Sequence, residues 1–320
     1  MKNPRLKISY SIFIILAMLV ALPVFSQQQQ TRQRPPNPTN EQVQKRVPDG
    51  VTFIPNIAYR KGNEAWKLDL AMPKERGNDP RPAIVFVHGG GWRNGDKRAA
   101  SFLNPTLSYA AKGYVCITVN YRLLKGNSRD IDQCVEDVKN AVRWLRAHAE
   151  KYNVDPNRIG ATGNSAGAHL SVMLGICPKD AELEGEGPYQ DYSSMVQAVA
   201  ASATPTSFLI PMSERGKERY EQEKANPNAK RDALMKQISP ATYLSADVPP
   251  LLLFHEASDN TVGVYQSDTF IKALRDAGAK DINYMLFGDG SGHGVFQRNI
   301  AVTEPAREAF FARTLNHKQE

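Results

Sequence analysis

Cysteine is scarce in this chain of 320 residues, which contains only Cys116, Cys134 and Cys177. An odd number cannot form a complete set of disulfides, and a domain of this size does not need one to fold. The spacing of the three also matches no metal-ligand pattern. We therefore interpret them as small buried apolar residues, with a single disulfide between one pair as the alternative.

A clustered basic surface is also missing. The formal net charge is +7 at pH 7, but Lys and Arg alternate with acids, notably over residues 214–236. No basic stripe is interleaved with aromatic residues, as it would be in a protein that binds nucleic acid. We therefore expect no nucleic-acid partner.

Long apolar runs are absent except near the start, where residues 12–22 are uninterrupted and apolar. This run is about half the roughly 20 residues that span a bilayer. Because Lys2, Arg5 and Lys7 precede it, it is typical of an export signal, and we predict cleavage near Ser26. An uncleaved anchor is the alternative. The expected location is periplasmic or extracellular, with no stable membrane span after cleavage.

The next segment, residues 27–47, is rich in Gln, Arg, Pro and Asn and has few apolar residues. Such a composition cannot bury enough surface to pack, so it predicts a flexible tether. The remaining residues, 48–317, are enough for one large α/β domain.

Within this domain, strand patterns alternate with helical ones. Residues 51–59 and 66–72 flank a short polar turn and predict an antiparallel hairpin. Continuously apolar runs then predict strands with helices on both faces, at residues 83–87, 114–119, 159–162, 196–200, 251–254 and 282–286. The alternation indicates a mostly parallel central sheet covered by helices on both faces. In such sheets ligands bind at the carboxyl ends of the strands.

Two helices and one insertion stand out in the pattern. Helical spacing is clearest over residues 131–151, where Asp130 and Gln133 indicate a capping box, and a last helix is predicted around 303–315. A small helical insertion is predicted around 205–240, densely charged over residues 213–237. It is either a lid over the site or a solvated surface helix.

The segment Gly163-Asn164-Ser165-Ala166-Gly167 joins a predicted strand to a small-residue, helix-compatible stretch. A Gly-x-Ser-x-Gly serine in this context projects from a sharp turn as a nucleophile. By itself the pentapeptide is equally compatible with an ordinary strand-to-helix turn.

A second segment, His88-Gly89-Gly90-Gly91-Trp92, follows the strand that ends at residue 87. Backbone N–H groups in a loop without side chains can stabilise the oxyanion of a tetrahedral intermediate. The alternative, a flexible glycine-rich turn, leaves its position directly after a core strand unexplained.

A serine nucleophile needs a base and an acid that orients it. Of the histidines downstream of Ser165, only His255 and His293 lie in segments that follow strands, and we predict that His293, which glycines flank, is the base. We predict Asp259 as the acid, with Glu256 as its rival and Asp289 as a weaker one. The order Ser, Asp, His is that of the hydrolases with a nucleophile elbow.

These segments together resemble the α/β-hydrolase fold, and in particular bacterial carboxylesterases with an HGGG-type oxyanion loop, similar to acetyl (xylan) esterases and feruloyl-esterase-like enzymes. The resemblance covers residues 48–315 and rests on Val87-His88-Gly89-Gly90-Gly91-Trp92, Asn120-Tyr121-Arg122-Leu123, Gly163-Asn164-Ser165-Ala166-Gly167-Ala168-His169-Leu170, Ser239-Pro240-Ala241-Thr242-Tyr243-Leu244 and Gly292-His293-Gly294.

The resemblance implies roles for individual residues. It makes Ser165 the nucleophile, Asp259 the acid and His293 the base. It also places the oxyanion hole at the backbone N–H groups of Gly90, Gly91 and Ala166. Two positions depart from the pattern of such enzymes, because Glu256 stands where a glycine is usual and Gly263 where a proline is usual.

The sequence therefore predicts an exported serine carboxylesterase that forms an acyl-enzyme and needs neither a metal nor an organic cofactor. The expected substrates are acetyl or feruloyl esters of plant polysaccharide, with Trp92, Tyr121 and Arg122 at the mouth of the cleft. One alternative is a generalist short-chain esterase or lipase. Another, of a different class, is a non-catalytic glycan-binding or adhesion module. The oligomeric state stays open.

Overall fold

The computed structural model describes residues 36–316, in which the chain from Asn37 onward forms one compact unit. The export signal predicted for residues 1–26 lies outside the described residues. Within residues 36–316, no helix has both the length and the apolar character needed to cross a bilayer. The three cysteines are buried and unpaired.

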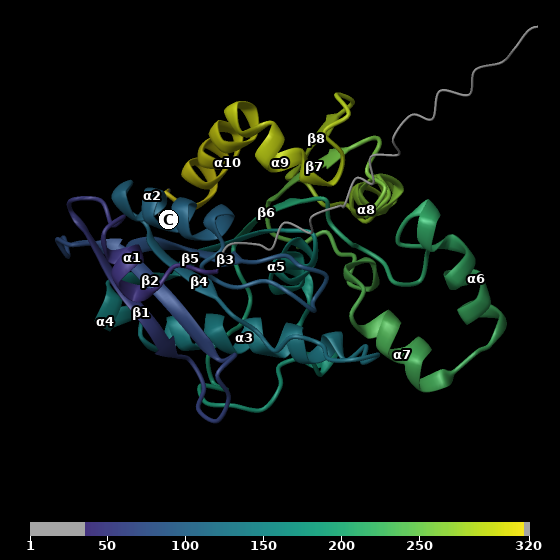
Figure 1. Ribbon diagram of the computed structural model, residues 1–320, viewed down its shortest axis with the longest axis horizontal. Coiled ribbons are helices and arrows are strands. Elements are labelled where there is room, and N and C mark those ends of the chain that lie inside the picture. The colour runs from purple at the N-terminus through teal and green to yellow at the C-terminus, as the bar shows by residue number, and fades with distance from the viewer. Residues whose placement is uncertain (1–35, 317–320) are drawn as a thin grey trace, which may run out of the picture. The chain divides into compact units, whose positions relative to one another are not determined.

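One eight-stranded sheet organises the domain (Figure 1). Its strands are β1 (Val51–Ala58), β2 (Lys67–Pro73), β3 (Arg81–Val87), β4 (Val115–Val119), β5 (Val154–Asn164), β6 (Ala198–Ser202), β7 (Leu251–Glu256) and β8 (Ile282–Phe287). They lie in the order β1-β2-β4-β3-β5-β6-β7-β8. β2 pairs antiparallel with β1 and β4, and all other neighbours are parallel. The predicted hairpin and mainly parallel sheet are confirmed.

Helices cover both faces of the sheet. They are α1 (Asn40–Gln44), α2 (Ala100–Ala111), α3 (Ile131–Ala147), α4 (Ala149–Tyr152), α5 (Ala166–Ile176), α6 (Lys217–Ala225), α7 (Ala229–Gln237), α8 (Tyr265–Asp276), α9 (Val295–Arg298) and α10 (Ile300–Leu315). Figure 1 shows α3 on one side of the sheet and α2, α9 and α10 on the other.

The alternation of side chains along β3 explains these two layers. Val85 belongs to a core cluster with residues of α3, α5 and α8, whereas its neighbour Phe86 belongs to one with residues of α2, α9 and α10. Successive side chains of a strand point to opposite faces, so a strand between two helical layers is apolar throughout. Each fully buried side chain of this kind contributes about 1.5–3 kcal/mol to folding.

β8 departs from this prediction. Residues 282–286 were expected to form a fully covered strand, but Asn283 is exposed and Leu286 is 55% exposed. The reason is topological, because β8 is the edge strand and, among the strands described, pairs only with β7.

The helix predicted for residues 131–151 also differs in detail. The structure ends α3 at Ala147 and begins α4 at Ala149, with His148 between them in a non-helical conformation. The capping box predicted at its start is absent, because the Asp130 side chain makes no cap hydrogen bond. Its carboxylate instead accepts a hydrogen bond from the Ser128 hydroxyl at 2.7 Å.

The tether predicted for residues 27–47 is wrong over its described part. Residues 40–44 form α1, which begins with a capping box between Thr39 and Gln42. Val43 is fully buried in a cluster with Phe53 and Leu103. The burial of Val43 and the hydrogen bonds that Arg98 donates to Pro38 and Asn40 hold this segment against the domain.

A buried ionic cluster around Asp69 of β2 fixes the same region. The Asp69 carboxylate accepts hydrogen bonds from Lys97 Nζ and Arg98 Nε, both at 2.7 Å, and from the backbone N–H of Asn56 at 2.7 Å. Arg98 continues to the carbonyl oxygen of Pro38 and the side chain of Asn40. Burial raises the pKa of Asp69, but the hydrogen bonds and charges of Arg98 and Lys97 outweigh burial and lower it.

Replacing Asp69 by Asn should therefore destabilise the domain strongly, because it leaves two buried cations without their counter-charge. We expect a loss of about 3–5 kcal/mol in the free energy of unfolding, measured by urea denaturation. The matched control is Lys272→Ala, which removes an exposed ion pair with Asp276 and should cost about 0.2–1 kcal/mol. Equal losses in the two variants would contradict the role assigned to the cluster.

Candidate active site

The predicted site residues lie on four loops that follow β3, β5, β7 and β8 at their carboxyl ends. These strands are parallel, so their carboxyl ends share one edge of the sheet. The loops carry residues 88–91, Ser165, Asp259 and His293 respectively.

Ser165 occupies the turn between β5 and α5. Its φ of 53° and ψ of −123° are unusual for a residue with a side chain, so the turn is strained. Its backbone N–H donates to the carbonyl oxygen of Ser202 at the end of β6, at 2.9 Å. Within residues 36–316, the Ser165 hydroxyl makes no hydrogen bond.

The two glycines that flank this turn are required by close packing. A Cβ on Gly163 would lie 2.4 Å from the backbone of Gly167, and one on Gly167 would lie 2.1 Å from the carbonyl oxygen of Val87. Real contacts are not this short, so any side chain at either position would push the turn away from β3. The two glycines of the pentapeptide are thus needed because the backbones of β3, β5 and α5 approach one another closely at this turn.

The loop after β3 is held by His88, whose Nδ1 donates to the carbonyl oxygen of Gly89 at 2.9 Å. Among residues 36–316, the backbone N–H groups of Gly90, Gly91 and Ala166 donate no hydrogen bond. Ala166 is also the first residue of α5, where the helix dipole favours negative charge. Among the described residues, all three predicted oxyanion-hole amides therefore lack a protein acceptor.

Asp259, whose side chain is buried, and His293, whose side chain is 29% exposed, form a pair across the loops after β7 and β8. His293 Nδ1 lies 2.8 Å from Asp259 Oδ2, and the other carboxylate oxygen accepts the backbone N–H groups of Thr261 and Val262 at 2.8 and 3.0 Å. Burial raises the pKa of Asp259, but hydrogen bonds from His255 and His293 outweigh it and hold the pKa well below its usual range. The Asp259 carboxylate is therefore ionised at neutral pH.

His255, which was expected to follow a strand, lies within β7 and is fully buried. Its Nε2 lies 2.9 Å from the carbonyl oxygen of Val262, and its Nδ1 lies 2.7 Å from the Ser267 hydroxyl. Since a carbonyl oxygen can only accept, Nε2 carries the proton. His255 thus fixes the loop that carries Asp259, a role that the sequence did not indicate.

The two rival acids have other partners. Glu256 accepts hydrogen bonds from Ser258, Gly290 and Gly292, and Asp289 accepts one from the backbone N–H of Ser291. Among the described hydrogen bonds, only Asp259 joins a carboxylate to His293.

Trp92 begins an aromatic cluster beside the serine turn. Its indole N–H donates to His169 Nδ1 at 3.2 Å, and both rings contact Phe208. His169 in turn donates its backbone N–H to the carbonyl oxygen of Ser165 and its Nε2–H to that of Ile238. The cluster therefore lies one helical turn from Ser165.

Tyr121 and Arg122 do not fit the substrate role predicted for them. Tyr121 is 1% exposed, stacks on His88 and donates its hydroxyl to the carbonyl oxygen of His88 at 2.8 Å. It supports the glycine loop from the core, so the prediction for it is wrong. The Arg122 guanidinium binds Asp137 and Glu136 of α3, and no described hydrogen bond joins it to Ser165 or His293.

The predicted helical insertion is present as α6 and α7, neither of which has a buried residue. Arg129 links it to the domain, because its guanidinium binds the Glu223 carboxylate of α6. The hydrogen bonds from Arg129 lower the pKa of Glu223 to about 2. Whether this insertion acts as a lid stays a prediction.

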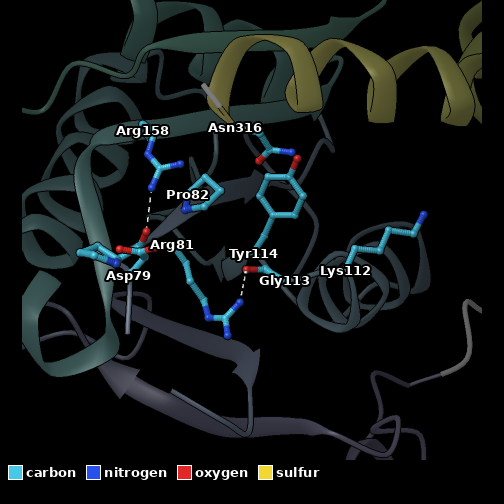
Figure 2. Close-up of a pocket in the computed structure, with 9 residues that line it drawn as sticks. Asp79, Arg81, Pro82, Lys112, Gly113, Tyr114, Arg158 and Asn316 are labelled. Carbon is cyan, nitrogen blue, oxygen red and sulfur yellow. Dashed lines mark hydrogen bonds between the residues drawn. The ribbon is translucent and has the colours of Figure 1, made fainter. Parts of the chain in front are cut away.

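A cavity of about 350 Å³ lies at the opposite edge of the sheet (Figure 2). It is lined by residues at the amino ends of β3 and β4, including Arg81 and Tyr114, and by Arg158. The Arg158 guanidinium donates to the carbonyl oxygen of Pro80, and the Arg81 guanidinium donates to the carbonyl oxygen of Gly113. Because these arginines bind backbone carbonyl oxygens and lie at the amino ends of the parallel strands, we do not assign the active site to this cavity.

Clusters suited to metal binding are also missing from residues 36–316, where no three His, Cys, Asp or Glu side chains could share an ion.

Two buried histidines predict how stability depends on pH. Burial lowers the pKa of His88 and of His169 to about 4. Between that value and the usual 6.5, the unfolded chain binds protons that the folded chain does not, so stability falls as pH falls through this window. At about pH 5 each histidine should cost about 2 kcal/mol relative to about pH 7.5.

The test is urea denaturation of the protein and of His169→Gln at these two pH values. The variant should lose about 2 kcal/mol less on acidification, because glutamine does not titrate. An identical loss in both proteins would contradict a neutral, buried His169.

Comparison with known proteins places these features in context. A family model described as BD-FAE matches residues 68–274. Among curated proteins of Mycobacterium tuberculosis (strain ATCC 25618 / H37Rv), the chain is 31% identical over 241 residues to "Probable carboxylic ester hydrolase LipM". It is 29% identical over 255 residues to "Esterase LipC".

These matches cover 72% and 77% of this chain, but only 53% and 60% of the two relatives. The chain thus spans little more than half the length of the curated relatives that it matches.

Solved structures are matched over nearly their whole length. A "truncated form of carbohydrate esterase from gut microbiota" has a TM-score of 0.69 and 26% identity, covering 83% of this chain and 97% of that one. Thermogutta terrifontis esterase 2, in a form phosphonylated by sarin, has a TM-score of 0.66 and 28% identity, covering 82% and 96%.

Proposed function

The chain belongs to the BD-FAE family and has the α/β-hydrolase fold of the esterases that it resembles, and we propose that it is a serine carboxylic-ester hydrolase. The observation that carries this proposal is the hydrogen bond between Asp259 and His293 at the sheet edge that also bears Ser165.

The roles follow from the chemistry of each group. An ionised Asp259 that accepts from Nδ1 leaves Nε2 of a neutral His293 without a proton, so Nε2 can act as a base. The strained turn between β5 and α5 presents the Ser165 hydroxyl as the nucleophile, whose proton His293 accepts. The free amides of Gly90, Gly91 and Ala166 supply donors for an oxyanion.

The reaction then has two steps. His293 takes the proton of Ser165 as its oxygen attacks the ester carbonyl, and the same histidine gives that proton to the alcohol that leaves. Water next attacks the acyl-enzyme, again with His293 as base, which releases the acid and restores the serine. Asp259 stays ionised and stabilises the imidazolium that forms in each step. No step requires a metal or an organic cofactor.

The named relatives support the reaction class. LipM is described as a probable carboxylic ester hydrolase and LipC as an esterase. The Thermogutta terrifontis esterase 2 structures include forms modified by sarin, tabun and paraoxon.

Replacing Ser165 by Ala should abolish turnover of an activated acetyl ester. We expect kcat to fall on the order of 10⁶-fold, because removal of a nucleophile leaves only binding and the oxyanion donors. The matched control is Ser245→Ala, at an exposed serine whose hydroxyl accepts one backbone N–H, and it should keep full activity. Near-normal turnover by Ser165→Ala would sink the assignment.

The finer proposal is that the enzyme is exported and removes acetyl or feruloyl groups from plant polysaccharide. It is supported by the segment before residue 27, which has the pattern of an export signal, and by the solved structure that is described as a carbohydrate esterase. Within the site, the partly exposed Trp92 ring, fixed by His169, offers a flat apolar surface for a sugar face.

A generalist short-chain esterase is the second candidate. It is favoured by the Thermogutta terrifontis esterase 2 structures that carry butyrate and propionate. The third, a non-catalytic glycan-binding or adhesion module, would bind glycans without reacting at Ser165.

A panel of substrates separates these candidates. Acetylated and feruloylated xylan oligosaccharides are compared with short p-nitrophenyl esters, with acyl release followed by mass spectrometry. The polysaccharide proposal predicts higher kcat/KM on the acylated sugars, and lower kcat/KM on those sugars in Trp92→Ala. Equal values across the panel would contradict it and favour the generalist esterase.

A further inference from the structure

Glu256 is a buried carboxylate that the proposed reaction does not use. It is the last residue of β7 and only 1% exposed. An ionised carboxylate at this depth is costly unless hydrogen bonds replace its lost water.

All the hydrogen bonds described for this carboxylate come from two loops. Oε2 accepts the backbone N–H of Ser258 at 2.8 Å, its hydroxyl at 2.6 Å and the backbone N–H of Gly292 at 3.1 Å. Oε1 accepts the backbone N–H of Gly290 at 3.2 Å. Ser258 is next to Asp259 in the chain and Gly292 is next to His293, so one carboxylate joins the two loops that carry the proposed acid and base.

The base loop needs such an anchor. Gly290 and Gly292 have φ of 75° and 56°, and a Cβ built on either would meet no atom within 4 Å. Backbone of this kind has little packing to restrict it and is free in conformation, so hydrogen bonds must fix it.

The other anchors of this loop lie around Ser291. Arg298 donates to its carbonyl oxygen, Asn299 donates to its hydroxyl and Asp289 accepts its N–H. Of the anchors described, only Glu256 ties the backbone of both residues that flank Ser291, and it also reaches the acid loop through Ser258.

We propose that Glu256 is a positioning residue that holds the loops of Asp259 and His293 in register, so that the imidazole keeps the orientation that Ser165 requires. This inference rests on the proposed function. Glu256 touches neither His293 nor Ser165 through any described contact and acts through the loop backbone. A displacement of about 1 Å in such a group can cost about 10²-fold in rate.

The carboxylate is suited to this task because it stays charged. Burial raises the pKa of Glu256, but the hydrogen bonds from Ser258, Gly290 and Gly292 outweigh burial and lower it. Hydrogen bonds from N–H groups to a charged acceptor are also stronger than those to a neutral amide oxygen.

Two variants test the proposal. Glu256→Gly removes the side chain and leaves its donors unpaired, and formate is added to refill the space with a carboxylate. Glu256→Gln keeps the size but removes the charge. The matched control is Asp281→Asn, which removes a carboxylate from an exposed ion pair with Arg313 just before β8, at the opposite end of that strand.

Three measurements are made on each protein. The first is kcat and KM on an activated ester, and the second is the melting temperature. The third is the low-field NMR signal of the His293 Nδ1 proton, which is identified by its absence from His293→Gln. This signal reports the bond to Asp259 whether or not the protein hydrolyses esters.

The proposal predicts that kcat of Glu256→Gly falls by about 10²-fold with little change in KM, that the His293 signal is lost, and that formate restores both. Asp281→Asn should match the unmodified protein. If Glu256→Gly does not fold, Glu256→Gln decides, and it should lower kcat and weaken the signal.

A folded Glu256→Gly with unchanged kcat, or with lowered kcat and an intact His293 signal, would overturn the inference, as would a Glu256→Gln with normal kcat and signal. A protein without any ester hydrolysis but with a His293 signal that depends on Glu256 would instead contradict the proposed function and leave the positioning role standing.

Discussion

The hydrogen bond between Asp259 and His293 is the contact on which the proposed chemistry depends. It joins loops that follow two paired strands, and the parallel register of β7 and β8, which sets Glu256 beside Phe287, brings those loops together. His255 holds the acid loop from the core, while Glu256 holds both loops by their backbone. Hydrogen bonds thus fix both loops that carry the pair.

Apolar packing stabilises the domain mainly in the two core clusters on either face of the sheet. The core strands and their two helical layers supply the stability that allows a strained turn at Ser165 and unpaired amides in the neighbouring loops. Strain of this kind persists only where the surroundings fix it, and here the backbone of Val87 lies against Gly167 with no space for a side chain. The buried cluster around Asp69 secures the antiparallel end of the same sheet.

Local patterns in the sequence predicted the strands, the serine turn and the glycine loop, because each depends on residues that are adjacent in the chain. Contacts between distant segments could not be predicted in the same way. The choice between Asp259 and Glu256 depends on which carboxylate bonds the His293 ring rather than the loop backbone. Tyr121 points inward, where it stacks on His88. The packing of α1 depends on one valine, and the exposure of β8 on its place at the sheet edge.

Covalent labelling tests the central claim most directly. The protein is treated with a fluorophosphonate, digested, and mapped by mass spectrometry. An activated serine should carry the single modification, on Ser165, and His293→Gln should label far more slowly, because the base that activates the hydroxyl is missing. Labelling of another serine, or equal labelling with and without His293, would contradict the account.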